Sequence, residues 1–281
     1  MRIFKIKSHA KINLALNIIS KKTNLHKIES IVSFISLHDL IYIKQISGKK
    51  HKIVFKGKFS KNIGKINTIS TLLKLLDKRK FLRKKKFEFV IIKNIPNQAG
   101  MGGGSMNAAS LINFFIKKKL FKISNNDLIK LTNQIGSDVI LGINPKNTIL
   151  CANGKIKKFS KNINLYTLVV KPNFGCSTKY IYSKVKSFSK PKFSSPKQSM
   201  FHVKYLKTLD NNLEKIAFKK YPKLKSIKAY LLNLRNNMFV RMSGSGSTIV
   251  AYFNSKSACN EAYKRFKVRF NSHWCITSKT I

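Results

Sequence analysis

Four glycines within five residues, at positions 100, 102, 103 and 104, interrupt the chain between two regular segments. The preceding run, residues 87–92 (FEFVII), predicts a mostly buried strand. The following run, residues 105–119 (SMNAASLINFFIKKK), has apolar residues at helical spacing and lysines at its end, where they suit the helix dipole. This order of strand, glycine-rich loop and helix predicts an anion-binding loop, because bare backbone N–H groups and a helix N-terminus attract phosphate.

The loop differs from two common phosphate-binding motifs. No Lys-Ser/Thr pair follows the glycines, so it is not a Walker A motif, and Ser105 stands where the dinucleotide fingerprint that starts at Gly100 needs its third glycine. A tightly packed turn is the alternative, but such turns rarely need this many glycines. We therefore expect the following residues to bind the phosphates of a cofactor: Pro96, Asn97, Gln98, Ala99, Gly100, Met101, Gly102, Gly103, Gly104, Ser105 and Met106.

The rest of the chain mixes strand and helix patterns without a regular alternation. Residues 10–16 alternate like a strand, with Lys11 and Asn13 on the face opposite the apolar residues. Ser124 and Asp127 are spaced as a helix cap, and Gly136 follows as a helix end. Helices are also expected at 203–218 and 222–234, a strand at 247–253, and a long loop at 183–200. This mixture predicts an α+β fold.

The composition is that of a folded protein. Apolar residues make up 43% of 281, and no uninterrupted apolar run is long enough for a membrane span or the core of a signal peptide. The four cysteines have no C-x-x-C spacing, so neither a zinc site nor a disulfide framework is predicted. We expect a cytoplasmic protein.

The charge is strongly positive, at +48 from 57 Lys and Arg against 9 Asp and Glu. Nucleic-acid binding is one interpretation, but 50 of the cations are lysine and only 7 are arginine, the side chain that reads bases best. The lysines are spread along the chain, and Ile, Asn and Phe are abundant too, as an AT-rich coding bias would give. We therefore expect no specific nucleic-acid partner, although the surface favours phosphate-bearing ligands.

The stretch from Pro96 to Ala109 resembles the phosphate loop of the small-molecule kinases that include galactokinase, homoserine kinase, mevalonate kinase and phosphomevalonate kinase. Its Gly-Gly-Gly-Ser-x-Asn-Ala-Ala form is similar to the branch that phosphorylates a cytidine diphosphate conjugate of methylerythritol, in the non-mevalonate route to isoprenoid precursors. Three further motifs agree and come in the expected order: SHAKINLAL at 8–16, GSDV at 136–139 and MSGSGST at 242–248.

The resemblance implies a two-domain small-molecule kinase fold. Residues 1–155 would form the N-terminal ATP-binding α+β domain, and residues 156–281 a C-terminal, ferredoxin-like α+β domain on the substrate side. It implies ATP and Mg²⁺ as cofactors, a small-molecule substrate, no membrane partner, and a monomer or weak homodimer. The metal ligands stay unassigned.

The resemblance also assigns roles to single residues. Lys11 and Asp138 match the catalytic lysine and aspartate. Taken alone, one lysine among fifty predicts a solvated surface group. The residues implied to contact substrate are Asn13, His26, Tyr182, Gly244 and Ser245, although Tyr182 also suits a core position. Leu25 stands where the family has a cytosine-stacking Tyr, and Met106 where it often has a second Ser.

Deprotonating a hydroxyl suggests a carboxylate base, and the chain has few candidates. Asp127 is used as a cap, Asp77 lies in a lysine-rich run, and Asp210 and Glu214 are four apart on an expected surface helix. The resemblance implies an acidic turn at Asp39. Asp138 follows a Gly-terminated helix and precedes Val-Ile-Leu, so it is the best candidate for a half-buried base.

Three other functions remain open. The first is a homoserine-kinase-like activity within the same superfamily. The second is a polyanion-binding protein on a kinase fold that has lost its activity, and the third is a basic surface that serves a partner protein. The Ser-x-Asn-Ala-Ala continuation disfavours the first, and the retained Lys11 and Asp138 disfavour the second.

Overall fold

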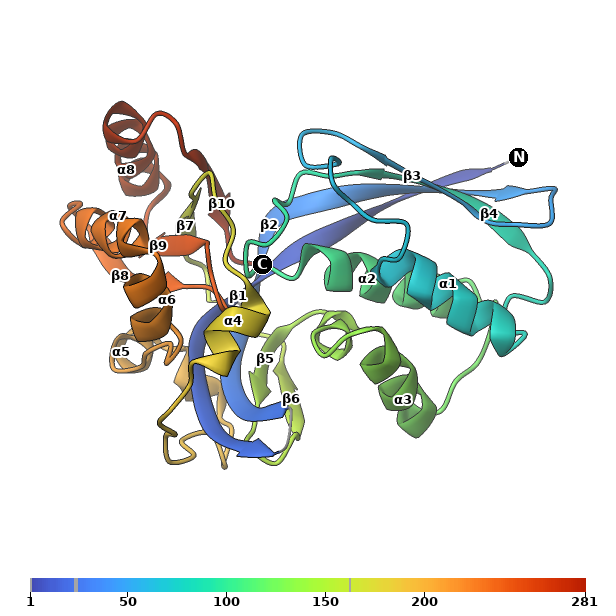
Figure 1. The fold of residues 1–281 in the computed structure, drawn as a ribbon, viewed down its shortest axis with the longest axis horizontal. Coiled ribbons are helices and arrows are strands. Elements are labelled where there is room, and N and C mark those ends of the chain that lie inside the picture. The colour runs from blue at the N-terminus through green and yellow to red at the C-terminus, as the bar shows by residue number, and fades with distance from the viewer. Residues whose placement is uncertain (1, 23–24, 162) are drawn as a thin grey trace. The chain divides into compact units, whose positions relative to one another are not determined.

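The computed structural model describes residues 2–22, 25–161 and 163–281 (Figure 1). The chain forms two compact units, neither of which is continuous in sequence. The first unit comprises the residues up to Ala10, Leu37–Pro96 and Gly102–Pro145, and the second comprises Lys11–Ser36, Asn97–Met101 and Lys146–Ile281. Strands β1 (Ile3–Lys22) and β2 (Leu25–Ile46) contribute to both.

The first unit contains the β3-β4-β2 part of a six-stranded sheet, covered by helices. The last part of β2 pairs antiparallel with β4 (Lys86–Ile92), and β3 (Lys52–Lys56) pairs parallel with β4. Helices α1 (Thr68–Lys78) and α2 (Gly103–Lys117) lie along one face of these strands (Figure 1). The expected strand at 87–92 and helix at 105–119 are confirmed, with the helix beginning and ending two residues earlier.

Alternation explains why β4 forms and which side it buries. Its side chains at Phe87, Phe89 and Ile91 are buried in the core of the first unit, as expected for a period of two along a strand. Helix α1 begins with a reciprocal cap in which Asn67 accepts from Ile69 and Ser70.

The last two elements of the first unit, in chain order, are a helix and a 3₁₀ turn. Helix α3 (Asn125–Ile135) begins at Ser124, whose hydroxyl accepts from Asp127 N at 3.1 Å, and it ends at Gly136. The 3₁₀ turn η1 (Val139–Gly142) follows. Both the predicted cap and the predicted helix end are confirmed.

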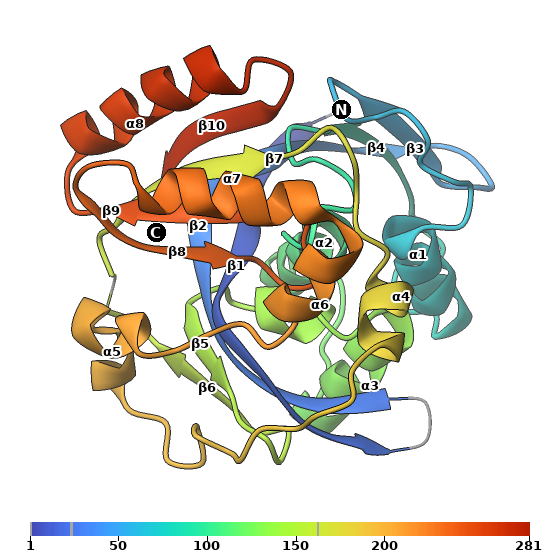
Figure 2. The same ribbon diagram turned by 60° about the vertical axis from the view of Figure 1, so that its left-hand side comes forward.

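The second unit contains a four-stranded antiparallel sheet in the order β10-β7-β9-β8. Helices α7 and α8 pack on it and share a core with it (Figure 2). When the strands of this sheet alone are numbered along the chain, their order is four-one-three-two. Helices lie in the two crossovers, which is the expected ferredoxin-like pattern. The bounds are β7 (Tyr166–Lys171), α7 (Pro222–Leu232), β8 (Asn237–Met242), β9 (Ile249–Phe253), α8 (Lys256–Arg269) and β10 (Trp274–Lys279).

Shorter elements complete the second unit. Residues 30–32 of β2 pair with β5, which pairs with β6. Between α4 and η2 the described chain has no helix or strand, in agreement with the loop expected at 183–200. The bounds are β5 (Asn147–Leu150), β6 (Ile156–Phe159), α4 (Thr178–Ser183), η2 (Gln198–Phe201), α5 (Val203–Lys207) and α6 (Glu214–Lys220).

The continuous helix predicted over 203–218 is wrong. Helix α5 ends at Lys207 and α6 begins at Glu214. Between them, backbone groups bond to β1: Leu16 N donates to Asp210 O at 3.0 Å, and Asn212 N donates to Leu16 O at 2.9 Å. These tertiary hydrogen bonds take the place of helical ones.

Within residues 2–22, 25–161 and 163–281, no helix is both long and apolar enough to cross a membrane. The α+β class is confirmed. The domain division after residue 155 stays a prediction.

A buried histidine in the first unit makes stability depend on pH. His51 Nδ1 accepts from Phe87 N at 3.1 Å, and Nε2 lies 3.3 Å from Asp77 Oδ1. Desolvation lowers the pKa of His51 below its ordinary value of 6.5, assisted by Lys86 and opposed by Asp77. The pKa values of two other histidines, His26 and His273, are also lowered, mainly by burial.

The unfolded chain therefore binds more protons than the folded one as pH falls through about 6.5. We expect the free energy of unfolding, measured by urea titration, to be lower at about pH 5.5 than at about pH 7.5. His51→Gln removes one titrating group and should flatten this slope. An equally steep slope in the variant would contradict the role given to His51.

Candidate active site

The glycine loop leads into α2 through an unusual backbone. Gly100 and Gly102 have φ of 69° and 66°, in the left-handed region that favours glycine. Gly102 is the capping residue of α2, and no side chain described here caps that end. The first N–H groups of α2 thus present the positive end of the helix dipole to an anion.

A buried ion pair supports the start of α2 within the first unit. Asp39 is fully buried, Lys93 is 3% exposed, and their charged groups are in contact. Asp39 also accepts from Asn94 N and Ile95 N, both at 2.8 Å, and from Asn107 Nδ2 at 3.0 Å. One carboxylate thus joins β2, the segment after β4 and the second turn of α2.

The same ion pair brings a positive charge to the glycine loop. A Cβ added to Gly103 would lie 3.3 Å from Lys93 Nζ. The prediction of an acidic turn at Asp39 is wrong. Asp39 lies inside β2, and its hydrogen bonds hold it in the interior. The sequence analysis did not identify Lys93 or Asn107 as site residues. The only sequence signal for Lys93 was its position directly after a buried strand.

Asp138 is half-buried, as predicted, at the residue that precedes η1. The turn packs closely on α2: a Cβ added to Gly142 would lie 2.6 Å from Ala109 Cβ and 3.0 Å from Met106 Sδ. A Cβ added to Gly136 would lie 3.8 Å from Ser105 Oγ. The segment that carries Asp138 therefore lies against the first turns of the helix that follows the glycine loop.

Lys11 lies in the second unit, in the middle of β1, and is only 4% exposed. A solvated surface lysine is thereby excluded. Its Nζ donates to Asn13 Oδ1 at 2.8 Å, and Asn13 Nδ2 donates to Ser30 Oγ at 2.8 Å. Ser30 in turn donates to Ala15 O at 2.6 Å. A chain of hydrogen bonds thus fixes the Lys11 side chain in the interior.

The glycine-rich turn at 242–248 lies beside the glycine loop. Ser243 Oγ donates to Gly100 O at 2.9 Å and accepts from Asn13 N at 3.1 Å. Gly244 has a φ of 56°, and Ser245 Oγ lies 2.9 Å from Thr178 Oγ1. One buried hydroxyl, that of Ser243, therefore joins β1, the glycine loop and this turn.

His26 and Tyr182 lie together, although 156 positions separate them in sequence. Their ring centroids are 5.3 Å apart with an interplanar angle of 48°. Burial lowers the pKa of His26, with a smaller contribution from Lys21, so His26 is neutral near pH 7. The Leu25 side chain, which replaces the expected Tyr, lies outside what the structure describes.

The protein groups around the glycine loop suit a bound nucleotide and its metal ion. Within the described part of the chain, no three His, Cys, Asp or Glu side chains gather at a metal site. Mg²⁺ in phosphoryl-transfer enzymes is bound largely by substrate phosphates and water with few protein ligands. The Ser105 hydroxyl lies in the first turn of α2 and would be available as such a ligand.

Gly100→Ala is expected to disrupt the site. The new Cβ would overlap the Ser243 carbonyl oxygen, and Ala at this φ adds strain of about 1–2 kcal/mol. Nucleotide affinity, measured by calorimetry, should fall together with stability. Gly154→Ala is the matched control, because Gly154 has a φ of 85° and open space around its Cβ position. Equal losses in the two variants would show that the contact with Ser243 is unimportant.

Two family models match this chain. The GHMP kinases N terminal domain matches residues 67–154, and the GHMP kinases C terminal model matches residues 200–271. A 4-diphosphocytidyl-2-C-methyl-D-erythritol kinase from Pelagibacter ubique is 66% identical over 281 residues, which is 100% of each chain. The enzyme of that name from Clostridium tetani is 31% identical and covers 99% of this chain and 100% of its own.

Solved structures show the same fold. A crystal structure of 4-(cytidine 5'-diphospho)-2C-methyl-D-erythritol kinase matches with a TM-score of 0.79 and 21% identity, over 98% of this chain and 99% of that one. A homoserine kinase from Cytophaga hutchinsonii matches with a TM-score of 0.69 and 14% identity, over 98% and 95%. The predicted two-domain kinase fold is therefore confirmed, whereas the individual site residues stay predictions.

Proposed function

The chain belongs to the 4-diphosphocytidyl-2-C-methyl-D-erythritol kinases of the GHMP kinase family, and from this premise we propose its reaction. It transfers the γ-phosphoryl group of ATP to the 2-hydroxyl of 4-diphosphocytidyl-2-C-methyl-D-erythritol, giving ADP and the 2-phosphate in the non-mevalonate route to isoprenoids. The observation that carries this proposal is 66% identity, along the whole chain, to a relative of that name.

In this proposal the glycine loop, residues 96–106, holds the ATP phosphates. Negative charge spreads over the phosphoryl oxygens in the transition state, so N–H donors and fixed cations contribute most of the catalysis. The first turn of α2 supplies the N–H groups, and Lys93 beneath Gly103 adds positive charge. When Mg²⁺ is bound, it neutralises charge on the β- and γ-phosphates, and the Ser105 hydroxyl is the group that would hold it.

Asp138 is the proposed general base. It takes the proton of the 2-hydroxyl while the hydroxyl oxygen bonds to the γ-phosphorus and the bond from that phosphorus to the ADP oxygen breaks. Its position against the first turns of α2 supports this role. Lys11 is proposed to stabilise the negative charge that develops on the attacking oxygen.

The remaining predicted residues would bind the substrate. His26 and Tyr182 form an aromatic pair that is proposed to hold the cytosine ring. Asn13 is fixed between Lys11 and Ser30 and is proposed to contact the polar part of the substrate. The final glycine turn, with its residues at 244 and 245, would supply backbone and hydroxyl groups to the same ligand.

The test is ADP release by the purified protein with Mg-ATP and each of three acceptors. We expect turnover with 4-diphosphocytidyl-2-C-methyl-D-erythritol and none with homoserine or mevalonate. Turnover with homoserine alone would favour the homoserine-kinase alternative. ATP binding without turnover of any acceptor would refute the proposed reaction, and a salt-sensitive nucleic-acid titration would then test the polyanion alternative.

We also propose a cytoplasmic location and a monomer or weak homodimer. All four cysteines are free and buried, as in proteins of a reducing compartment. Burial raises the pKa of all four thiols, to about 11 for Cys176 and Cys275 and about 12 for Cys259. Thiols of that kind resist oxidation, because the thiolate is the reactive form.

A further inference from the structure

The segment between α5 and α6 contains a buried asparagine that the proposed mechanism does not use. Asn211 is 2% exposed. Its Nδ2 donates to Met242 O at 2.8 Å and to Gly244 O at 2.7 Å, and its Oδ1 accepts from Leu213 N at 3.0 Å. Asn211 therefore binds two carbonyl groups of the final glycine turn with one amide group.

That turn is itself joined to two parts of the proposed site. Ser243 lies between the two carbonyl groups that Asn211 holds. Its hydroxyl donates to Gly100 O of the glycine loop and accepts from the backbone of Asn13 in β1. A shift of the turn would therefore move the hydroxyl that fixes both segments.

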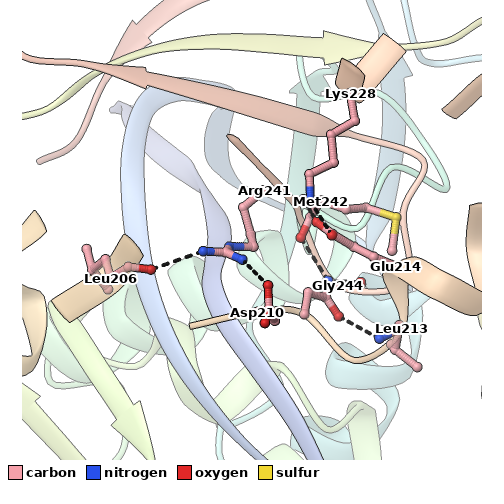
Figure 3. A network of polar contacts seen from close by, with 9 residues as sticks. Leu206, Asp210, Leu213, Glu214, Lys228, Arg241, Met242 and Gly244 are labelled. Carbon is pink, nitrogen blue, oxygen red and sulfur yellow. Dashed lines mark hydrogen bonds and ion pairs between the residues drawn. The ribbon is translucent and has the colours of Figure 1, made fainter. Parts of the chain in front are cut away.

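Ion pairs on either side hold the Asn211 segment in place (Figure 3). Glu214 accepts from Lys228 Nζ at 2.5 Å and from Met242 N at 2.8 Å. Arg241 donates to Asp210 Oδ1 at 3.0 Å. The surface role predicted for Glu214 is thus wrong, because it is 6% exposed and binds the strand that leads into the turn.

We infer that Asn211 is a positioning residue for phosphoryl transfer, which acts by fixing the glycine turn at 243–247 and, through Ser243, the glycine loop and Asn13. The inference rests on the proposed kinase reaction. Small displacements of positioned groups lower the rate of transfer steeply. Asn211 itself touches neither substrate, but it fixes a turn and a loop that are proposed to bind them, so its loss should lower kcat and also weaken substrate binding.

The test compares Asn211→Asp with Asn212→Asp, which introduces the same charge one residue away. An aspartate at 211 lacks the Nδ2 donors, and its carboxylate is repelled by the carbonyl oxygens of Met242 and Gly244. Asn212 uses its Oδ1 to accept from Ile18 N and Ser189 Oγ, at 2.8 and 2.9 Å, and an aspartate keeps that acceptor. Asn211→Ala serves as the uncharged variant in case Asn211→Asp does not fold.

The expected result is a fall in kcat of roughly 10- to 100-fold for the two Asn211 variants, per folded molecule, with a smaller rise in KM for ATP and substrate. Asn212→Asp should retain wild-type kcat. A kcat that falls only in proportion to the folded fraction, in the Asn211 variant that folds, would overturn the inference. If the wild-type protein shows no turnover of this substrate, the proposed reaction is instead refuted.

Hydrogen exchange gives a readout that needs no substrate. The amides of residues 97–101 and 243–247 should exchange faster in Asn211→Ala than in the wild type or in Asn212→Asp. Unchanged exchange in both segments would also overturn the inference.

Discussion

Asp138→Asn is expected to lower kcat by about 10²- to 10⁴-fold, the usual contribution of a general base. Asparagine has nearly the same shape but cannot take the proton of the acceptor hydroxyl. The Asp138 side chain does not cap η1, so the turn keeps its hydrogen bonds when the charge is removed. ATP affinity, measured by calorimetry, should therefore stay close to that of the wild type.

Asp127→Asn is the matched control for this variant. It makes the same change at an exposed residue in the first turn of α3, in the same unit, and should leave turnover intact. The measurement is ADP release with Mg-ATP and 4-diphosphocytidyl-2-C-methyl-D-erythritol. Equal turnover in Asp138→Asn and the wild type would keep the kinase reaction but assign the base to another residue.

The second large effect is on stability. Asp39→Ala is expected to lower the free energy of unfolding by about 3–5 kcal/mol, because it leaves the Lys93 ammonium buried without its counter-charge. It also removes the acceptor of Asn94 N, Ile95 N and Asn107 Nδ2. Since these groups connect β4 with α2, nucleotide affinity should fall as well.

Guanidinium denaturation followed by circular dichroism measures this loss. Asp77→Ala is the control, because Asp77 pairs with Lys86 but its side chain is 35% exposed, and such pairs contribute about 0–1 kcal/mol. Asp39→Ala combined with Lys93→Met should recover part of the stability, since no unpaired charge then remains. A loss below about 1 kcal/mol in the single variant would show that the ion pair is unimportant.

Local patterns in the sequence were sufficient for the elements around the glycine loop. The strand at 87–92, the helix that follows the glycines and the cap at Ser124 each depend on neighbouring residues, and the structure confirms these three elements. Asp138 was placed correctly as a half-buried group for the same reason. The family resemblance, rather than periodicity, provided the reaction and the choice of Lys11.

Contacts between distant segments were not predictable in this way. Asp39 and Lys93 are 54 positions apart, and nothing near either residue indicates that they meet. The break at 208–213 depends on hydrogen bonds to β1 and to the final glycine turn, so a helical pattern over 203–218 gave the wrong result. Lys11 was expected on a polar strand face, yet both faces of β1 are covered there.

The division of β1 and β2 between the two units has a consequence for synthesis on the ribosome. Residues 11–36 emerge early, but most of the unit to which they belong is residues 146–281. At roughly 5–20 residues per second, these strand segments wait on the order of ten seconds or longer for their partners. During that time their apolar side chains, such as Ile12 and Leu14, are exposed to other chains, so the nascent protein needs protection that its finished fold does not.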